Sequence, residues 1–174
     1  MDSSQTRRQL KDARRIVIKI GTRVVTGTGP GLDLEFLDRL ARQVARLHER
    51  NVQVVLVTSG AVHLGRRALG VKKTSEDISL RQAAAAVGQP ELMRNYMEAF
   101  GAHGLLTAQI LMTQNDMRDR HRYVHLSNTL ETLLRRGVVP VINENDSVSV
   151  EGVTFVENDL LAAMIAAKAR ADLL

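Results

Sequence analysis

The 174-residue sequence contains no cysteine, and this absence limits the chemistry that the chain can carry out. It can form no disulfide, bind no metal through thiolate and use no thiol nucleophile. Any metal would need oxygen or imidazole ligands. His121 and His125 lie four residues apart in a segment expected to be helical, but no third ligand is apparent beside them. We therefore expect no metal site built by the protein alone.

Long apolar runs and aromatic residues are also scarce. No apolar run approaches the roughly 20 residues that span a bilayer, and residues 1–15 lack the apolar core of a secretion signal. We therefore expect a cytoplasmic protein without membrane association. The net charge is +5, but aromatic residues make up only 3% of the chain and most basic residues are scattered, so nothing offers a stacking platform for bases. We expect no nucleic-acid partner.

From residue 15 onward, apolar runs of strand length alternate with segments of helical periodicity. The runs are continuous and rich in valine and isoleucine, which is typical of strands buried on both faces. The predicted strands cover residues 15–20, 52–57, 105–112 and 138–142. The predicted helices cover residues 34–47, 61–70, 79–100 with an interruption at 88–90, 119–136 and 158–171. We predict a basic arm over residues 1–14 and one doubly wound α/β domain over residues 15–174, with a mostly parallel sheet.

Polar clusters follow directly on three of the predicted strands. They are Lys19-Gly21-Thr22, Thr58-Ser59-Gly60 and Asn143-Glu144-Asn145-Asp146. Because ligands bind at the carboxyl ends of parallel strands, we expect the three loops to converge on one crevice. Lys19 lies in an apolar run, where an ammonium is costly unless an anion compensates it, and we interpret that anion as a phosphate.

Other interpretations of these residues remain open on residue type alone. Lys19 could extend from an edge strand to water, and Asn143 and Asp146 could be ordinary turn residues. Asn158 and Asp159 could cap a helix and complement its dipole. The chain has no G-x-x-x-x-G-K-[ST], no G-x-G-x-x-G and no G-x-S-x-G around Ser59, which disfavours the common nucleotide folds and a serine hydrolase.

Five blocks of the sequence together resemble the glutamate 5-kinases of the amino-acid kinase family. In chain order they are VIKIGT (17–22), VTSGAV (57–62), AVGQ (86–89), VPVINEND (139–146) and END (157–159). The resemblance runs from about residue 15 to residue 174 and implies the αβα sandwich of that family. It also implies ATP-dependent phosphorylation of the side-chain carboxylate of L-glutamate, the first step of proline biosynthesis. Two alternatives stay open: a related kinase with another carboxylate or phosphate substrate, and a non-catalytic amino-acid-binding module.

The resemblance also implies roles for individual residues. Lys19 would contact the transferring phosphate, Asp159 would orient Lys19, and Gly21 and Thr22 would let backbone N–H groups approach phosphate oxygens. Asp146, with Asn143 nearby, would take the α-ammonium of the substrate. The implied substrate-binding residues are Ser59, Gly60, Asn143, Asp146 and Asn158. ATP and its Mg²⁺ are the implied cofactors, proline the implied feedback inhibitor and a homo-oligomer the implied assembly.

The sequence departs from the family pattern in two places. Val156-Glu157 stands where Gly-Asp is expected, which makes the path of that loop uncertain, and residues 147–155 are a segment expected to close over substrate. The second half of the ATP site that the family carries does not occur in these 174 residues. Because residues 172–174 also resemble the start of another strand, we expect a fragment that is inactive or nearly so on its own.

Overall fold

The structure, a computed structural model, describes residues 12–27, 29, 31–71, 77–149 and 158–174. Its sheet has four parallel strands in the spatial order β1-β2-β4-β3. The strands are β1 (Arg15–Lys19), β2 (Gln53–Val57), β3 (Thr107–Met112) and β4 (Val139–Glu144). Each predicted strand is observed within two residues of its predicted ends. The predicted basic arm lies mainly outside the described residues.

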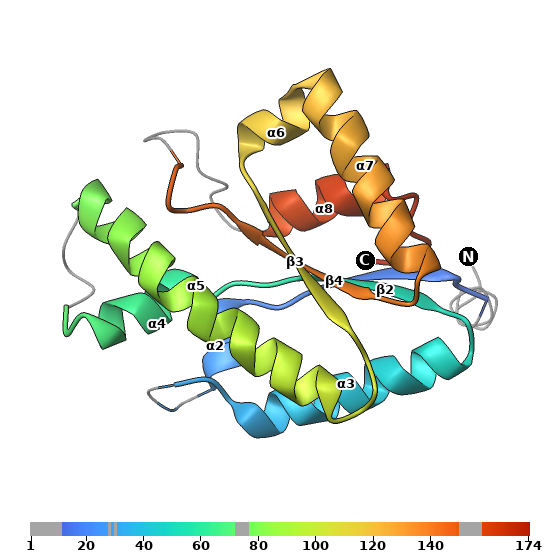
Figure 1. Ribbon diagram of the computed structural model, residues 1–174, viewed down its shortest axis with the longest axis horizontal. Helices are drawn as coiled ribbons and strands as arrows, with labels where there is room; N and C mark the ends of the chain where they lie inside the picture. The colour runs from blue at the N-terminus through green and yellow to red at the C-terminus, as the bar shows by residue number, and fades with distance from the viewer. Residues whose placement is uncertain (1–11, 28, 30, 72–76, 150–157) are drawn as a thin grey trace, which may run out of the picture.

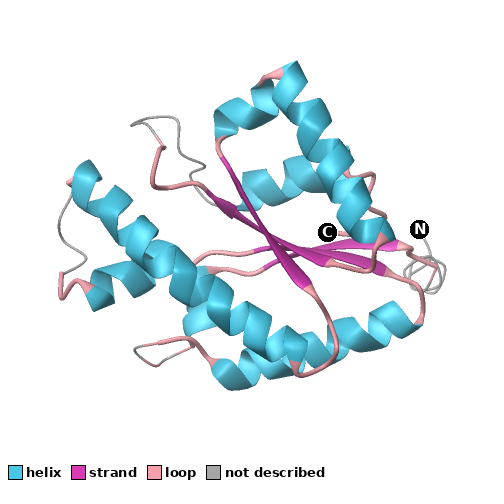
Figure 2. Ribbon diagram, viewed as in Figure 1, coloured by secondary structure: helices cyan, strands magenta, loops and turns pink. Residues whose placement is uncertain are grey.

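Helices cover both faces of the sheet (Figures 1 and 2). One face carries α3 (Leu34–Glu49), α4 (Ala61–Ala68) and α5 (Ile78–Gly101), and the other carries α6 (Gln114–Arg118), α7 (Arg120–Arg135) and α8 (Asn158–Lys168). A short helix that the sequence did not predict, α2 (Thr22–Thr26), follows β1. The prediction of a three-layer αβα sandwich is confirmed.

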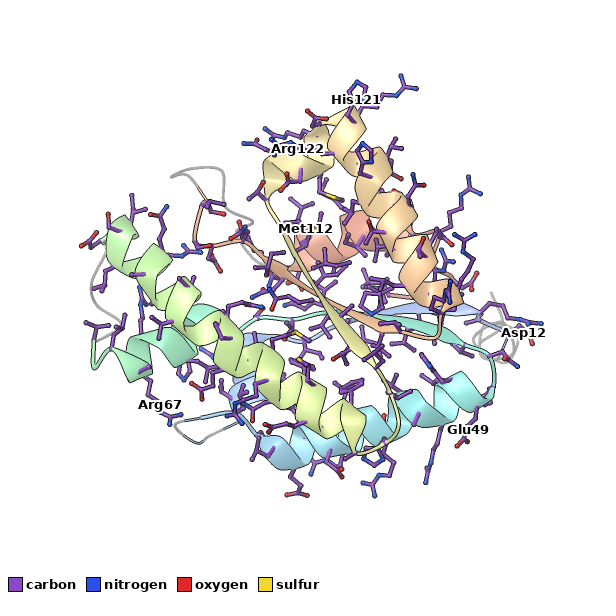
Figure 3. The ribbon with its side chains drawn as sticks, viewed as in Figure 1. Asp12, Glu49, Arg67, Met112, His121 and Arg122 are labelled. Carbon is purple, nitrogen blue, oxygen red and sulfur yellow. The ribbon has the colours of Figure 1, made fainter. Side chains whose placement is uncertain are left out.

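The two cores follow from the alternation of side chains along the strands. On β2, Val54 and Leu56 belong to the core beneath α3, α4 and α5, whereas Val55 and Val57 belong to the core beneath α7 and α8. A strand buried on both faces needs apolar residues at every position, which explains its continuous run. Figure 3 shows side chains filling both layers, with Met112 inside and Glu49, Arg67 and His121 at the surface.

The predicted interruption of the helix at residues 88–90 is wrong, because α5 runs unbroken through Pro90. A Cβ on Gly88 would lie 1.9 Å from the carbonyl oxygen of Ala61, so this glycine lets α4 cross α5 in backbone contact. Pro90 removes the hydrogen bond to the carbonyl of Ala86, but both residues are exposed and water can replace it. Although α5 is long, no helix within the described residues is apolar enough to cross a membrane.

The predicted polar turn at residues 113–119 is also wrong, since it contains α6. The carboxylate of Asp116 accepts hydrogen bonds from both the backbone N–H and the hydroxyl of Thr113, each at 2.7 Å. This cap supplies a partner for the backbone N–H of Thr113, at the start of the helix. A Thr-x-x-Asp pattern can therefore begin a helix where composition alone indicates a turn.

The chain returns to the sheet at residues 172–174, as the sequence predicted. Leu173 pairs in parallel with Ile16 on the free side of β1, and Val17 N–H donates to the carbonyl of Leu173 at 2.9 Å. The Asp172 carboxylate accepts from the backbone N–H groups of Arg14 and Arg15 at 2.7 and 2.9 Å. These contacts cover part of the outer side of β1, the terminal strand of the four.

Candidate functional site

The three polar loops predicted to converge do so, at the carboxyl ends of β1, β2 and β4. They surround a cavity of about 440 Å³. Eight of the nine predicted site residues line it: Lys19, Gly21, Thr22, Ser59, Gly60, Asn143, Asp146 and Asn158. The ninth, Asp159, reaches it through an ion pair described below. Parallel strands bring their carboxyl ends to one edge, which explains why residues far apart in the sequence meet here.

Lys19 and Asp159 form an ion pair beside this cavity. Lys19 ends β1, Asp159 lies in the first turn of α8, and Nζ is 2.7 Å from Oδ1. The Lys19 side chain is only 26% exposed, and a Cβ on Gly21 would lie 3.7 Å from its Nζ. The ammonium is therefore held at the cavity between the backbone at Gly21 and Asp159, whose side chain is 60% exposed. A fixed cation at this position suits a phosphate ligand.

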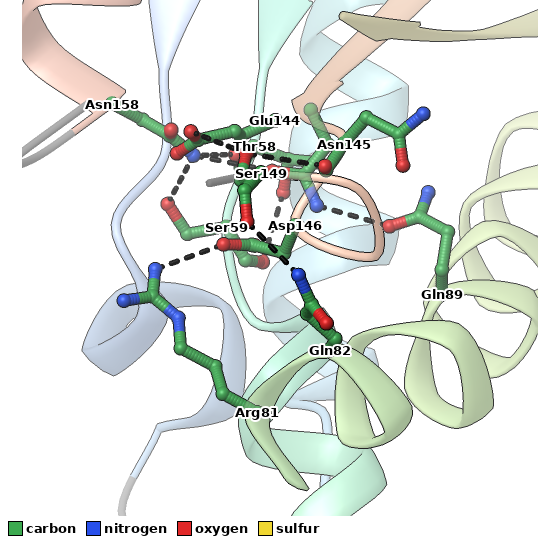
Figure 4. A network of polar contacts seen from close by, with 11 residues as sticks. Thr58, Ser59, Arg81, Gln82, Gln89, Glu144, Asn145, Asp146, Ser149 and Asn158 are labelled. Atoms are coloured by element: carbon green, nitrogen blue, oxygen red, sulfur yellow. Dashed lines mark hydrogen bonds and ion pairs between the residues drawn. The ribbon is translucent and has the colours of Figure 1, made fainter. Parts of the chain in front are cut away.

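A network of side-chain amides holds the loops together (Figure 4). Asn158 Nδ2 donates to the carbonyl of Thr58, to Ser59 Oγ at 2.9 Å and to Asn143 Oδ1 at 3.2 Å. Asn143 Nδ2 in turn donates to Gln89 Oε1 at 2.9 Å. Asn143 is 2% exposed, and it belongs to β4 and not to the loop after it. The network thus joins β2, β4, α5 and α8.

Beneath Ser59, a second buried contact fixes the end of β2. The hydroxyls of Thr58 and Tyr96 share a hydrogen bond of 2.8 Å, and both residues are fully buried. Burial raises the pKa of Tyr96, which keeps this hydroxyl protonated. After Ser59 the backbone turns through Gly60 at φ +113°, a conformation that favours glycine, and α4 then begins. The Ser59 hydroxyl is therefore carried on a rigid turn.

Asp146 faces α5 across the cavity. Its Oδ1 accepts a hydrogen bond of 2.9 Å from Arg81, and its side chain is only 13% exposed (Figure 4). The neighbouring Gln82 donates to the carbonyl of Ser149 at 3.0 Å, and Ser149 Oγ donates to Glu144 Oε1 at 3.1 Å. The loop after β4 is therefore tied to α5 at two points.

The sequence matches the model of the amino acid kinase family over residues 14–174. The chain belongs to that family. It is 50% identical over 165 residues to a glutamate 5-kinase of Trichlorobacter lovleyi. The aligned region covers 95% of this chain and 44% of that protein. A glutamate 5-kinase of Syntrophus aciditrophicus is 49% identical over 157 residues, or 90% of this chain and 40% of its own length. A glutamate 5-kinase of Azoarcus sp. is 48% identical over 168 residues, which are 97% of this chain and 45% of that protein. The chain thus spans less than half the length of these curated relatives, and the resemblance inferred from its five blocks is confirmed.

Three basic residues of this amino acid kinase site were not found by the sequence reasoning. His63 and Arg66 on α4 and Arg81 on α5 all line the cavity. The spacing of His63 and Arg66, three apart after Gly60, places both on one helical face and could have indicated them. Arg81 had no such signal, because its alanine-rich helix indicated packing. Val156 and Glu157, with the rest of residues 150–157, lie outside the described residues.

The charges that line the cavity suit an anionic ligand carrying one positive group. Basic side chains come from Lys19, Arg66 and Arg81, and carboxylates from Glu144 and Asp146. Within the residues that the structure describes, no cluster of three or more His, Asp or Glu side chains could hold a metal ion.

Proposed function

We propose that this chain is the glutamate-binding part of a glutamate 5-kinase. The reaction transfers the γ-phosphoryl group of ATP to the side-chain carboxylate of L-glutamate and is the first step of proline biosynthesis in the cytoplasm. The observation that carries the proposal is the Lys19–Asp159 ion pair beside a cavity that also contains Asp146. The names of the relatives support the same activity.

The chemistry needs alignment and charge neutralisation more than proton transfer. A glutamate side chain is ionised at neutral pH, so its carboxylate attacks phosphorus without a general base. One carboxylate oxygen bonds to the γ-phosphorus, the bond to the bridging oxygen breaks, and ADP leaves. In the proposal, Lys19 neutralises charge on the transferring group, Asp159 holds the ammonium in place, and backbone N–H groups at Gly21 and Thr22 approach phosphate oxygens.

The other end of the cavity would bind the amino-acid head group. Asp146 would accept from the α-ammonium, and Ser59 with the turn at Gly60 would supply donors. Asn143 and Asn158 would contact substrate while they hold the loops together, as their amide network suggests. In the proposal, Mg²⁺ binds with the phosphates of ATP.

The proposal extends to the whole protein in three respects. Residues 15–174 form the N-terminal part of the kinase domain, and residues 1–14 form a basic arm before it. The chain alone turns over slowly or not at all, since the residues that complete an ATP site in the family are not among these 174. The active enzyme is a homo-oligomer that proline inhibits.

The test measures ATP- and L-glutamate-dependent formation of an acyl phosphate, trapped with hydroxylamine, for the 174-residue chain and for the complete gene product that contains it. In the complete protein, Lys19→Ala should lower kcat about 100- to 1,000-fold, the effect of removing one group that stabilises transition-state charge. Lys168→Ala is the matched control, because Lys168 packs over the ring of Tyr123 and lies outside the cavity. Its activity should stay within about twofold of the wild type.

Either alternative function would give a different result. A complete protein that binds L-glutamate but forms no hydroxamate would favour a non-catalytic amino-acid-binding module. Turnover of another carboxylate or phosphate in preference to L-glutamate would identify a related kinase. Full activity in Lys19→Ala would overturn the proposed role of Lys19.

A further inference from the structure

Arg81 presents a guanidinium to the cavity with most of its hydrogen-bonding capacity available. The group carries five N–H donors, and among the described residues it makes one side-chain hydrogen bond, from its terminal nitrogen to Asp146. Its side chain is 43% exposed, whereas that of Asp146 is 13% exposed. An ion pair with so exposed a cation stabilises a fold little. The placement of Arg81 therefore calls for an explanation other than stability.

We propose that Arg81 binds the α-carboxylate of the amino-acid substrate while Asp146 binds its α-ammonium. The inference rests on the proposed function, in which Asp146 receives the ammonium. An α-amino acid carries its two head-group charges on one carbon, so a carboxylate must lie next to any ammonium bound at Asp146. Arg81 is the cation in direct contact with Asp146. If the α-ammonium and α-carboxylate of the substrate lay across the Arg81–Asp146 pair, each of these two side chains would face an opposite charge. The net charge of the site would not change.

Geometry favours Arg81 over Lys19 for this role. The planar guanidinium matches a carboxylate with two parallel hydrogen bonds, which the ammonium of Lys19 cannot do. Lys19 is also engaged by Asp159, at the end of β1. Moreover, the contact between Gln82 and the carbonyl of Ser149 fixes the Asp146 loop to the same turn of α5 that carries Arg81. The two charges are thereby held as one unit, as preorganised recognition of both substrate groups requires.

Two analogues of L-glutamate separate the two contacts. 4-Aminobutyrate is L-glutamate without its α-carboxylate, and glutarate is L-glutamate without its α-ammonium. The Kd of each of the three ligands is measured by calorimetry for the complete protein and for Arg81→Gln and Asp146→Asn. Arg94→Gln is the matched control, because Arg94 also lies on α5 and pairs with a carboxylate, that of Glu98, outside the cavity.

The proposal predicts a crossed pattern. Arg81→Gln should weaken L-glutamate about 10- to 100-fold, the effect of one charge-assisted hydrogen-bonded pair, and leave 4-aminobutyrate within about twofold. Asp146→Asn should weaken L-glutamate and 4-aminobutyrate but not glutarate. Arg94→Gln should change none of them.

Two results would overturn the inference, and they can be told apart. If Arg81→Gln weakens L-glutamate and 4-aminobutyrate equally, Arg81 only positions Asp146, and the proposed function stands. If the wild type binds L-glutamate no better than the two analogues, the proposed function fails and the inference fails with it.

Discussion

Two arginine–carboxylate pairs lie at opposite ends of the same sheet and differ in how many hydrogen bonds the arginine donates. Arg15, at the amino end of β1, donates to Gln53 at 2.9 Å, to both carboxylate oxygens of Glu131 and to the carbonyl of Ala169. Its side chain is 17% exposed. Arg81, near the carboxyl ends of the strands, is 43% exposed and reaches Asp146 through one nitrogen.

The difference separates a structural arginine from one suited to bind a ligand. Arg15 connects β1 with β2, with α7 and with the residue after α8, so its four hydrogen bonds join the sheet to one helix layer. A guanidinium with four of its five N–H donors engaged has little to offer a ligand. Arg81 keeps donors for a ligand and contributes less to the fold. The number of acceptors around each guanidinium thus distinguishes Arg15 from Arg81, although each forms an ion pair with a carboxylate.

The largest effect on stability should come from breaking the Arg15–Glu131 pair, whose arginine makes four hydrogen bonds. Arg15→Gln should lower the free energy of unfolding by about 2 kcal/mol, because it leaves Glu131 and the carbonyl of Ala169 without their cation. Arg81→Gln should lower it by less than about 0.5 kcal/mol, since it removes one hydrogen bond from a half-exposed guanidinium and not four. Urea unfolding of the 174-residue chain, followed by circular dichroism, measures both. Equal losses in the two variants would contradict the distinction.

An intermediate effect is expected at Gln89, which supports the site from α5. Gln89→Leu removes the acceptor for Asn143 Nδ2 and leaves a buried amide without its partner, at a cost of about 1 kcal/mol. L-Glutamate affinity should fall about three- to tenfold, because Asn143 also meets Asn158 and through it Ser59. Calorimetry with L-glutamate measures the loss.

Gln89→Glu is the control for this effect, since a carboxylate can still accept from the amide of Asn143. It should restore affinity to within about twofold of the wild type. If Glu at this position is as harmful as Leu, acceptance from Asn143 does not explain the effect, because Glu keeps both the shape and the acceptor of Gln89.

The sequence predicted the part of the site that lies at strand ends. Continuous Val and Ile runs marked the strands because both faces of the sheet are covered, and polar residues directly after them had to meet at one edge. Lys19, Ser59 and Asp146 were found in this way. What the residues would do there came from the family resemblance and not from periodicity.

The contributions of α5 could not be predicted, because they depend on how that helix packs. Arg81 meets Asp146 from 65 positions away, and no local pattern records such a contact. The same helix was expected to break near Gly88 and Pro90. It continues because Gly88 fits against α4 and Pro90 faces solvent, and neither condition is visible in the sequence.

The smallest expected effect is on the pH dependence of the unfolding free energy, through Glu131 at the Arg15 end of the sheet. The hydrogen bond from Arg15 holds the pKa of Glu131 below its ordinary value of 4.5. A carboxyl whose pKa is lower in the folded state contributes stability that is complete above its ordinary pKa and is lost as pH falls through its folded-state pKa.

The advantage of the wild type over Glu131→Gln in unfolding free energy should therefore be constant from neutral pH to about pH 5 and shrink below it. Urea unfolding at a series of pH values from about 3 to about 7 measures that advantage. In an Arg15→Gln background the pH-dependent part should shrink, because the largest cause of the lowered pKa of Glu131 is gone while Arg135 and Arg170 remain. An unchanged pH dependence would show that Arg15 is not that cause.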